Sequence, residues 1–323
     1  MEMLLKKKIT SVWLIGILLL MPVAGRPAGT LALVGKTGIV DSAGRKIIVK
    51  TPFKRVISLY AAHTENVYSL GGEDQLVGVS RSSRYPAPAA KKKRFSQRDG
   101  AEKFLAARPD LVLIRPMIDR AYPGLVRQLE KYGITVVSLQ PVTIDEMYQY
   151  WKVLGRLLGK ESTADAMAAN FTRRIDAIVG ITAPLSPKKE VYFEAIHAKM
   201  KTFAPTAMAI FCLTAAGGIN VAADAASVRG TNIAFYGKER ILARGDRIDI
   251  YLAQRGRMNQ VTAEQIRTEP GFDAIKAVRA GAVHLIDEAI VSRPTLRLIT
   301  GICRIGAVLY PDFFPASFSD ICH

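Results

Sequence analysis

The sequence predicts an α/β protein of two similar lobes, and three observations lead to this fold class. Short apolar runs rich in β-branched residues alternate with helical patterns along most of the 323 residues. A long helical stretch without strand signals divides this alternation into two series. One segment of the first series is echoed in the second. We therefore expect two Rossmann-like lobes with parallel sheets, joined by a helical spacer.

The first lobe shows four strand candidates in which apolar residues run without interruption. Such runs are typical of strands covered on both faces, as in parallel sheets. They lie at residues 55–59, 76–79, 111–114 and 135–139. A helical pattern over residues 121–132 precedes the last strand, and Gly133 is expected to end that helix.

The spacer begins at Thr143, where Thr143 and Glu146 form the pattern of a capping box. The only breakers after it are Gly155 and Gly159, and the helical pattern resumes to about Val179. The second series follows, with strand candidates at residues 191–196, 248–252 and 282–286 and a second capping box at residues 262–265.

Residues 102–114 and 239–251 can be laid over each other with a one-residue adjustment. Each reads as an acidic helix start, a short helix, a turn and a buried strand. An internal echo across a spacer predicts two similar lobes that face a ligand cleft. We expect an N-terminal lobe over 33–142, a backbone helix over 143–183, a C-terminal lobe over 184–310 and a tail over 311–323.

The N-terminus has the layout of a signal peptide over residues 1–32. Three lysines at residues 6–8 precede an apolar run over 11–21, and small residues allow cleavage after Gly25 or Ala32. An uncleaved membrane anchor is the alternative. No cysteine lies near either cleavage site, so we expect an exported, periplasmic protein that is not a lipoprotein.

Composition and motifs exclude several classes of protein. Disordered and collagen-like chains are excluded by the 49% of hydrophobic residues, while 45 basic against 28 acidic residues leave anionic partners open. No nucleophile elbow or H-E-x-x-H motif occurs, and the histidines show no metal-ligand spacing. The basic run at residues 91–94 has one aromatic neighbour, which suits a solvated loop better than a nucleic-acid interface.

Several short pieces then occur in a recognisable order and spacing. They are residues 55–59, 64–65, 70–72, 76–79, 83–86, 102–114, 129–137, 216–220 and 281–287. Together they resemble the periplasmic substrate-binding proteins of ABC importers for vitamin B12, iron–siderophores and haem, over residues 38–310. The resemblance implies two lobes joined by one rigid backbone helix, small hinge motion, no enzymatic activity and a monomer.

The resemblance also implies a partner, the transmembrane permease dimer of an ABC importer. Family members carry one acidic residue on each lobe that docks on permease arginines, and Glu102 and Glu239 occupy the matching positions. Two surface carboxylates at a fixed separation would set register and association rate. The alternative is that each glutamate only stabilises the start of its helix.

The resemblance places a ligand site on the loops between the lobes. Tyr85 matches an aromatic that packs on a corrin ring, and Arg293 matches a basic position facing the cleft. Further candidates on these loops are Tyr60, His63, Arg81, Arg115, Met117, Tyr192, His197, Lys199 and Arg229, with Phe235 and Tyr236 as replacements for a missing tryptophan. Arginine and tyrosine together suit a large, flat, anionic chelate.

The expected ligand is a metal chelate, and no intrinsic cofactor is expected. A ferric siderophore is favoured over cobalamin because the tryptophans expected in two loops are absent; haem is a further alternative. His63 or Met117 as an axial metal ligand is a minor hypothesis. An exported hydrolase or chelatase is the alternative from another class. For the three cysteines, the family suggests Cys212–Cys303, and Cys303–Cys322 is the rival disulfide.

Overall fold

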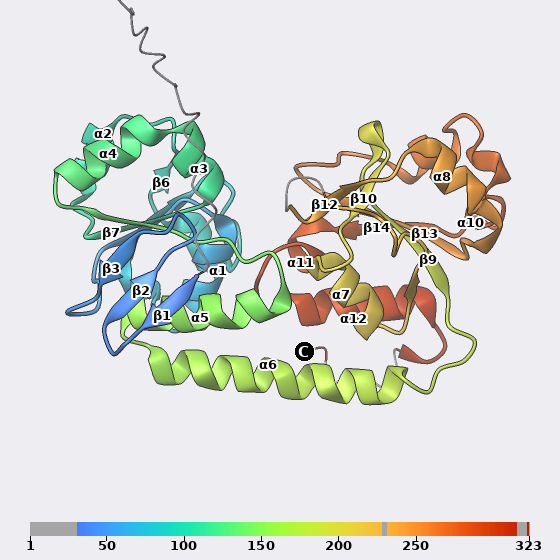
Figure 1. The fold of residues 1–323 in the computed structure, drawn as a ribbon, viewed down its shortest axis with the longest axis horizontal. Helices are drawn as coiled ribbons and strands as arrows, with labels where there is room; N and C mark the ends of the chain where they lie inside the picture. Colours follow the sequence, from blue (N-terminus) through green and yellow to red (C-terminus); the bar gives the residue numbers. More distant parts are fainter. Residues whose placement is uncertain (1–30, 228–230, 315–321, 323) are drawn as a thin grey trace, which may run out of the picture.

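The computed structural model describes residues 31–227, 231–314 and 322 of the chain. Figure 1 shows two lobes side by side, with the long helix α6 (Glu161–Thr182) running beneath both of them. The expected fold class of two α/β lobes is therefore confirmed. Within the described part of the chain, no helix has the length and apolar character needed to cross a membrane.

The N-terminal lobe is built on a five-stranded sheet in the order β6-β5-β4-β7-β8, and every pairing in it is parallel. Its strands are β4 (Val56–Ser58), β5 (Leu76–Ser80), β6 (Arg94–Phe95), β7 (Leu111–Ile114) and β8 (Thr135–Ser138). Four of the five coincide with the apolar runs predicted as strands. Parallel strands are covered on both faces, which explains why these runs do not alternate with polar residues.

Four helices flank this sheet, and a small antiparallel sheet that the sequence did not predict lies beside it. The helices are α1 (Ala61–Ser69), α2 (Ala101–Ala107), α3 (Pro116–Ala121) and α4 (Pro123–Lys131); the small sheet holds β1 (Ala32–Val34), β2 (Gly38–Val40) and β3 (Lys46–Ile48). Leu31 is buried just before β1. Cleavage after Ala32, one of the two predicted sites, would therefore remove a buried residue.

The helical spacer contains two helices rather than one. Helix α5 (Ile144–Leu158) ends at Gly159, which has a φ of 66°, and α6 starts two residues later. A left-handed residue ends a helix, and glycine adopts that conformation without steric cost. Helix α6 packs on α5 at one end and on α7 (Met208–Ala215) and α12 (Leu298–Leu309) at the other. It is thus the backbone helix that links the lobes (Figure 1).

The C-terminal lobe has a mixed sheet in the order β12-β10-β9-β13-β14, with β11 pairing to β9. Its strands are β9 (Glu190–Ile196), β10 (Lys201–Phe203), β11 (Ile219–Asn220), β12 (Ile233–Phe235), β13 (Ile250–Arg255) and β14 (Val283–Asp287). The three predicted strands correspond to β9, β13 and β14, which are mutually parallel. The remaining helices are α8 (Lys238–Ala243), α9 (Ala263–Arg267), α10 (Lys276–Arg279) and α11 (Glu288–Val291).

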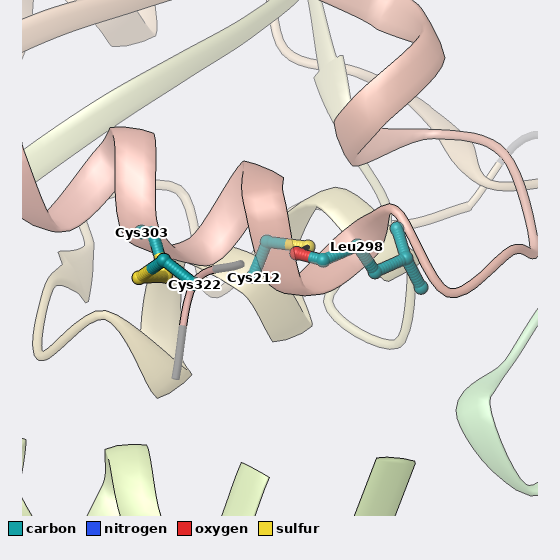
Figure 2. Close-up of a disulfide and its surroundings, with 4 residues drawn as sticks. All are labelled: Cys212, Leu298, Cys303 and Cys322. Carbon is teal, nitrogen blue, oxygen red and sulfur yellow. Dashed lines mark hydrogen bonds between the residues drawn. A yellow bond between two sulfur atoms is a disulfide. The ribbon is translucent and has the colours of Figure 1, made fainter. Parts of the chain in front are cut away.

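A disulfide ties the end of the chain to the last long helix. Of the two pairings left open, the structure contains Cys303–Cys322, with Cα atoms 6.1 Å apart (Figure 2). Cys212 is a buried free thiol on α7, and burial raises its pKa. Its Sγ lies 3.8 Å from the carbonyl oxygen of Leu298, on the side of α12 shown in Figure 2. The pairing suggested by the family resemblance is therefore wrong.

Candidate functional site

The carboxyl ends of the parallel strands of both lobes meet where the lobes touch. Helix α1 follows β4 in the N-terminal lobe, and the segment between α11 and α12 follows β14 in the C-terminal lobe. Glu65 Oε1 on α1 accepts a hydrogen bond of 2.8 Å from Arg293 Nη1 in that segment. Asn66 Nδ2 donates to the carbonyl oxygen of Pro294 at 2.8 Å. In open α/β sheets, ligands bind outside the carboxyl ends of the strands, so this seam is the candidate ligand site.

Two arginines stack on tyrosines at the seam. The Arg115 guanidinium lies 4.4 Å from the centre of the Tyr60 ring; Arg115 directly follows β7, and Tyr60 lies two residues after the end of β4. Arg297 of the C-terminal lobe lies 4.3 Å from the ring centre of Tyr85 in the N-terminal lobe. Stacking on a ring holds a guanidinium in place while its in-plane N–H groups can still donate. The seam therefore presents two oriented cations.

The segment that carries Tyr85 is held by a buried hydroxyl network. Thr64 Oγ1 lies 2.9 Å from both Ser58 Oγ and Ser83 Oγ, and Ser83 Oγ lies 2.8 Å from Ser80 Oγ. Arg94 Nη1 donates to the carbonyl oxygens of Ser80 and Ser83. Arg94, the last residue of the basic run, thus clamps this loop. The clamp leaves the Tyr85 side chain 49% exposed on a fixed backbone.

His63 is not available as a metal ligand. Its side chain is fully buried; Nδ1 lies 2.7 Å from the Tyr150 hydroxyl and Nε2 lies 3.0 Å from the carbonyl oxygen of Ile114. Burial, together with the nearby Arg115 charge, lowers the pKa of His63 to about 3. Both nitrogens are used inside the protein, so the hypothesis of axial ligation by His63 is wrong. The described residues include no cluster of three histidines, cysteines or carboxylates suited to a metal ion.

His197 lies at the end of β9, next to a buried carboxylate. Glu194 is fully buried and accepts hydrogen bonds from the Tyr251 hydroxyl at 2.5 Å and from Asn259 Nδ2 at 3.2 Å; His197 Nδ1 lies 2.8 Å from it. The Glu194 hydrogen bond raises the pKa of His197. This network fixes the carboxyl end of the central C-lobe strand, with the imidazole partly exposed beside it.

The other predicted ligand residues divide into exposed and buried ones. Arg81, Met117, Lys199 and Phe235 are exposed and remain candidates. Tyr192 and Tyr236 are buried in the C-lobe core, with ring centres 5.7 Å apart, which excludes ligand contact in this conformation. Tyr192 belongs to β9 and Tyr236 directly follows β12, and both rings are buried in the core of the lobe. Arg229 lies outside the described residues.

The two predicted docking glutamates have matching local structure. Glu102 in α2 and Glu239 in α8 are both exposed, and each follows a glycine cap by two residues, Gly100 and Gly237. Helices α2 and α8 belong to different lobes and lie on the side of the molecule opposite α6 (Figure 1). The internal echo seen in the sequence therefore places one exposed carboxylate on each lobe, on a common side.

A shallow depression of about 410 Å³ lies away from the seam, on the N-terminal lobe. Its lining residues are Arg45, Lys46, Ile47, Glu130, Gly133, Ile134, Thr135 and Val136. Arg45 is already paired there with Asp41 and Asp119. We prefer the seam as the ligand site, because the parallel strands of both lobes end there and its stacked arginines belong to both lobes.

A two-lobed α/β fold linked by a backbone helix, with arginines stacked on tyrosines where the lobes meet, suits ligand binding between the lobes. The chain matches the periplasmic binding protein family over residues 56–290 and belongs to it. Family members of this kind are substrate-binding transport proteins of ABC importers rather than enzymes.

Individual relatives support this assignment. The chain is 26% identical to an uncharacterized ABC transporter substrate-binding lipoprotein of Bacillus subtilis, and the match covers 85% of this chain and 86% of that one. It is 29% identical to a vitamin B12-binding protein of Vibrio cholerae over 54% of this chain and 62% of that one. A solved structure of a possible iron-binding periplasmic protein from Staphylococcus epidermidis is 27% identical, with a TM-score of 0.70, covering 80% of this chain and 100% of that one.

One expectation about localisation needs correction. The sequence led us to expect a protein that is not a lipoprotein, because no cysteine lies near the two predicted cleavage sites. The Bacillus subtilis relative is named a lipoprotein, which contradicts that expectation. The prediction was drawn from the leader alone, and export within this family is compatible with a lipid anchor. The predicted signal peptide falls almost entirely on residues 1–30, which lie outside the described part of the chain.

Proposed function

We propose that this chain captures a metal chelate between its lobes and delivers it to the permease dimer of an ABC importer. The observation that carries the proposal is the pair of arginine–tyrosine stacks at the seam, Arg115 on Tyr60 and Arg297 on Tyr85. Family membership supplies the transport role, and the stacks supply the ligand chemistry. The proposed working unit is a monomer with an N-terminal lobe, a helical backbone and a C-terminal lobe at the limits predicted from the sequence.

The charge at the seam favours an anionic chelate. Arg293 and Arg297 face the carboxylate of Glu65, and Arg115 adds a third guanidinium group beside Tyr60. Paired hydrogen bonds from arginine to an oxyanion are among the strongest polar contacts in proteins. Exposed Tyr85 and Met117 add a soft, partly apolar surface for a flat ligand face. A ferric siderophore with anionic donor groups combines both requirements, and haem carboxylates share this chemistry.

A corrinoid is the second candidate. It is favoured by the relative from Vibrio cholerae that is named a vitamin B12-binding protein. The exposed Tyr85 offers one ring for stacking on a corrin, and exposed Phe235 offers another on the C-terminal lobe. The described seam contains no tryptophan, since Trp151 lies buried in α5. We therefore place cobalamin second.

A ligand panel tests the proposal directly. We expect a ferric catecholate to raise the melting temperature most, because a ligand that binds only the folded state stabilises it. The panel also contains a ferric hydroxamate, haemin, cyanocobalamin and cobinamide. Stabilisation by cyanocobalamin alone would move the assignment to corrinoids, and turnover of any chelate would favour the alternative of a hydrolase or chelatase.

Calorimetric titration of variants then locates the bound chelate. Arg115→Gln is expected to weaken binding about tenfold or more, because it removes a charge-assisted hydrogen-bond donor. The matched control is Arg120→Gln, an exposed arginine on the same helix, α3. Equal affinities for both variants would contradict a ligand site at the seam.

A further inference from the structure

Glu65 is a buried carboxylate that joins the two lobes directly. Its side chain is 3% exposed and comes from α1 of the N-terminal lobe. Both of its cationic partners, Arg293 and Arg297, come from the C-terminal lobe, far away in the sequence. Burial raises the pKa of Glu65, while the two arginines act in the opposite direction. A carboxylate in this position is costly to bury unless both lobes stay in contact with it.

The two arginines hold Glu65 in different ways. Arg293 Nη1 donates to Oε1 at 2.8 Å, whereas Arg297 Nη1 stands 3.6 Å from Oε2, and Oε2 accepts no hydrogen bond in the described structure. Arg297 is instead stacked on Tyr85 at 4.3 Å. The first contact is therefore a full charge-assisted hydrogen bond and the second is a longer-range attraction.

Asn66 adds a second crossing beside the first. Its Nδ2 atom donates to the Pro294 carbonyl oxygen at 2.8 Å and to the Tyr150 hydroxyl of α5 at 3.2 Å. Asn66 is fully buried. Consecutive residues of α1 thus grip consecutive residues of the C-lobe segment, with Glu65 on Arg293 and Asn66 on Pro294. We call these two contacts the interlobe clasp.

We propose that Glu65 is a positioning residue: through the clasp it fixes the spacing of the lobes, and through its charge it keeps Arg297 over Tyr85, ready for an anionic group of the chelate. This rests on the proposed function for its ligand, but the clasp itself makes a claim about the ligand-free protein. A single linking helix, α6, constrains the lobes at one point on the far side. The clasp and the stack of Arg297 on Tyr85 add contacts at the seam, and constraints there in addition to the backbone helix limit rotation of the lobes.

The spacing of the lobes in the ligand-free protein tests the clasp. Spin labels are attached to cysteines introduced at Gln128 on α4 and at Asp273 in the C-terminal lobe, both exposed. The native cysteines do not compete, because one is buried and two form the disulfide. We expect one narrow distance distribution between the labels in the wild type. Glu65→Gln is expected to broaden it, and the exposed control Glu73→Gln is expected to leave it unchanged.

The two arginines provide the discriminating comparison. Arg293→Gln is expected to broaden the distribution as Glu65→Gln does, and the double variant is expected to add nothing further, because both changes break one contact. Arg297→Gln is expected to leave the distribution narrow. Narrow distributions in Glu65→Gln and in Arg293→Gln would overturn the clasp. If Glu65→Gln fails to fold, the distance distribution of Arg293→Gln alone tests the clasp.

The second claim, that Glu65 keeps Arg297 in place for an anionic group of the ligand, is tested with haemin, which carries two carboxylates. Arg297→Gln is expected to weaken haemin binding about fivefold to tenfold at unchanged lobe spacing, and Glu65→Gln is expected to weaken it by releasing the stacked arginine. Unchanged haemin affinity in both variants would overturn the role of Glu65 in presenting Arg297. If wild-type protein binds no member of the panel, the proposed function fails, while the label distances still decide the clasp.

Discussion

At the scale of single residues, the contacts that a side chain makes determine its role more than its residue type does. Arg94 looked like part of a solvated basic run, yet it clamps a loop through two backbone carbonyls. His63 looked like a ligand and is a buried structural group. Tyr85 could be placed at the ligand site through the family resemblance, and Arg115 through its position on a loop after a predicted strand. The contact between Glu65 and Arg297 could not, since it joins segments more than 200 residues apart.

His63 leads to a prediction about stability and pH. Its pKa falls from 6.5 to about 3 on folding, so between these values the unfolded chain binds more protons than the folded one. Stability should therefore fall as the pH drops below 6.5, by about 1.4 kcal/mol per pH unit from this group. The raised pKa of His197 acts with the opposite sign, and its contribution is lost as the pH rises above 6.5.

Urea unfolding of wild type and His63→Gln between pH 4.5 and 7.5 measures this contribution. The difference between the two proteins removes the other histidines, including His284, whose pKa burial also lowers. We expect the variant to have the flatter acid limb. Parallel acid limbs would show that His63 does not remain neutral in the folded protein.

At the scale of elements, most of the strands that the sequence predicted are largely buried. The runs at β4, β7 and β13 are apolar because helices cover both faces of their sheets. Strands β10 and β12 were missed because they are three residues long, antiparallel and partly exposed. The sequence predicted a helix breaker at Gly159, but it could not predict the direction in which the chain turns between α5 and α6. Its left-handed conformation and its contact with Pro52 depend on the tertiary structure.

Two glycines of the spacer give opposite predictions. Gly159→Ala should destabilise the protein by about 1–3 kcal/mol, because φ is 66° and a Cβ would lie 2.5 Å from Pro52 Cγ. Gly180→Ala should stabilise it by about 0.5–1 kcal/mol, since that glycine is inside α6 with nothing within 4 Å of a Cβ. Chemical unfolding measures both. Equal effects would mean that the turn between α5 and α6 is not fixed.

The disulfide Cys303–Cys322 makes a measurable contribution to the free energy of unfolding. It closes a loop with a sequence separation of 19, which corresponds to about 3 kcal/mol of stability in the chain-entropy model. We expect Cys322→Ser to lower the urea midpoint, and Cys303→Ser with Cys322→Ser to have the same effect. A much larger loss in the double variant would indicate that Cys303 has another partner, such as Cys212.

At the scale of the whole molecule, helix α6, the interlobe clasp and the stack of Arg297 on Tyr85 connect two α/β lobes. Trp151 of α5 packs on Phe171 of α6 with ring centres 5.3 Å apart, which anchors the backbone helix to the N-terminal lobe. The duplication itself was readable from the echo between residues 102–114 and 239–251. How the lobes face each other was not, because that depends on contacts between distant segments.

The duplicated glutamates carry the prediction about the permease. Glu102→Lys together with Glu239→Lys should abolish delivery to a reconstituted importer while chelate affinity stays within about twofold, because rim charges guide docking rather than ligand binding. Glu161→Lys is the matched control: it is also an exposed glutamate in the first turn of a helix, α6. Loss of chelate affinity in the double variant, or equal transport by both proteins, would contradict the docking role.

Hydrogen–deuterium exchange, with and without the tightest-binding member of the chelate panel, most directly tests capture between the lobes. We expect slower exchange in segments of both lobes at once, at the starts of α1 and α3 and between α11 and α12, with little change along α6. Protection confined to one lobe, or centred on the depression beside Arg45, would contradict a chelate held at the seam.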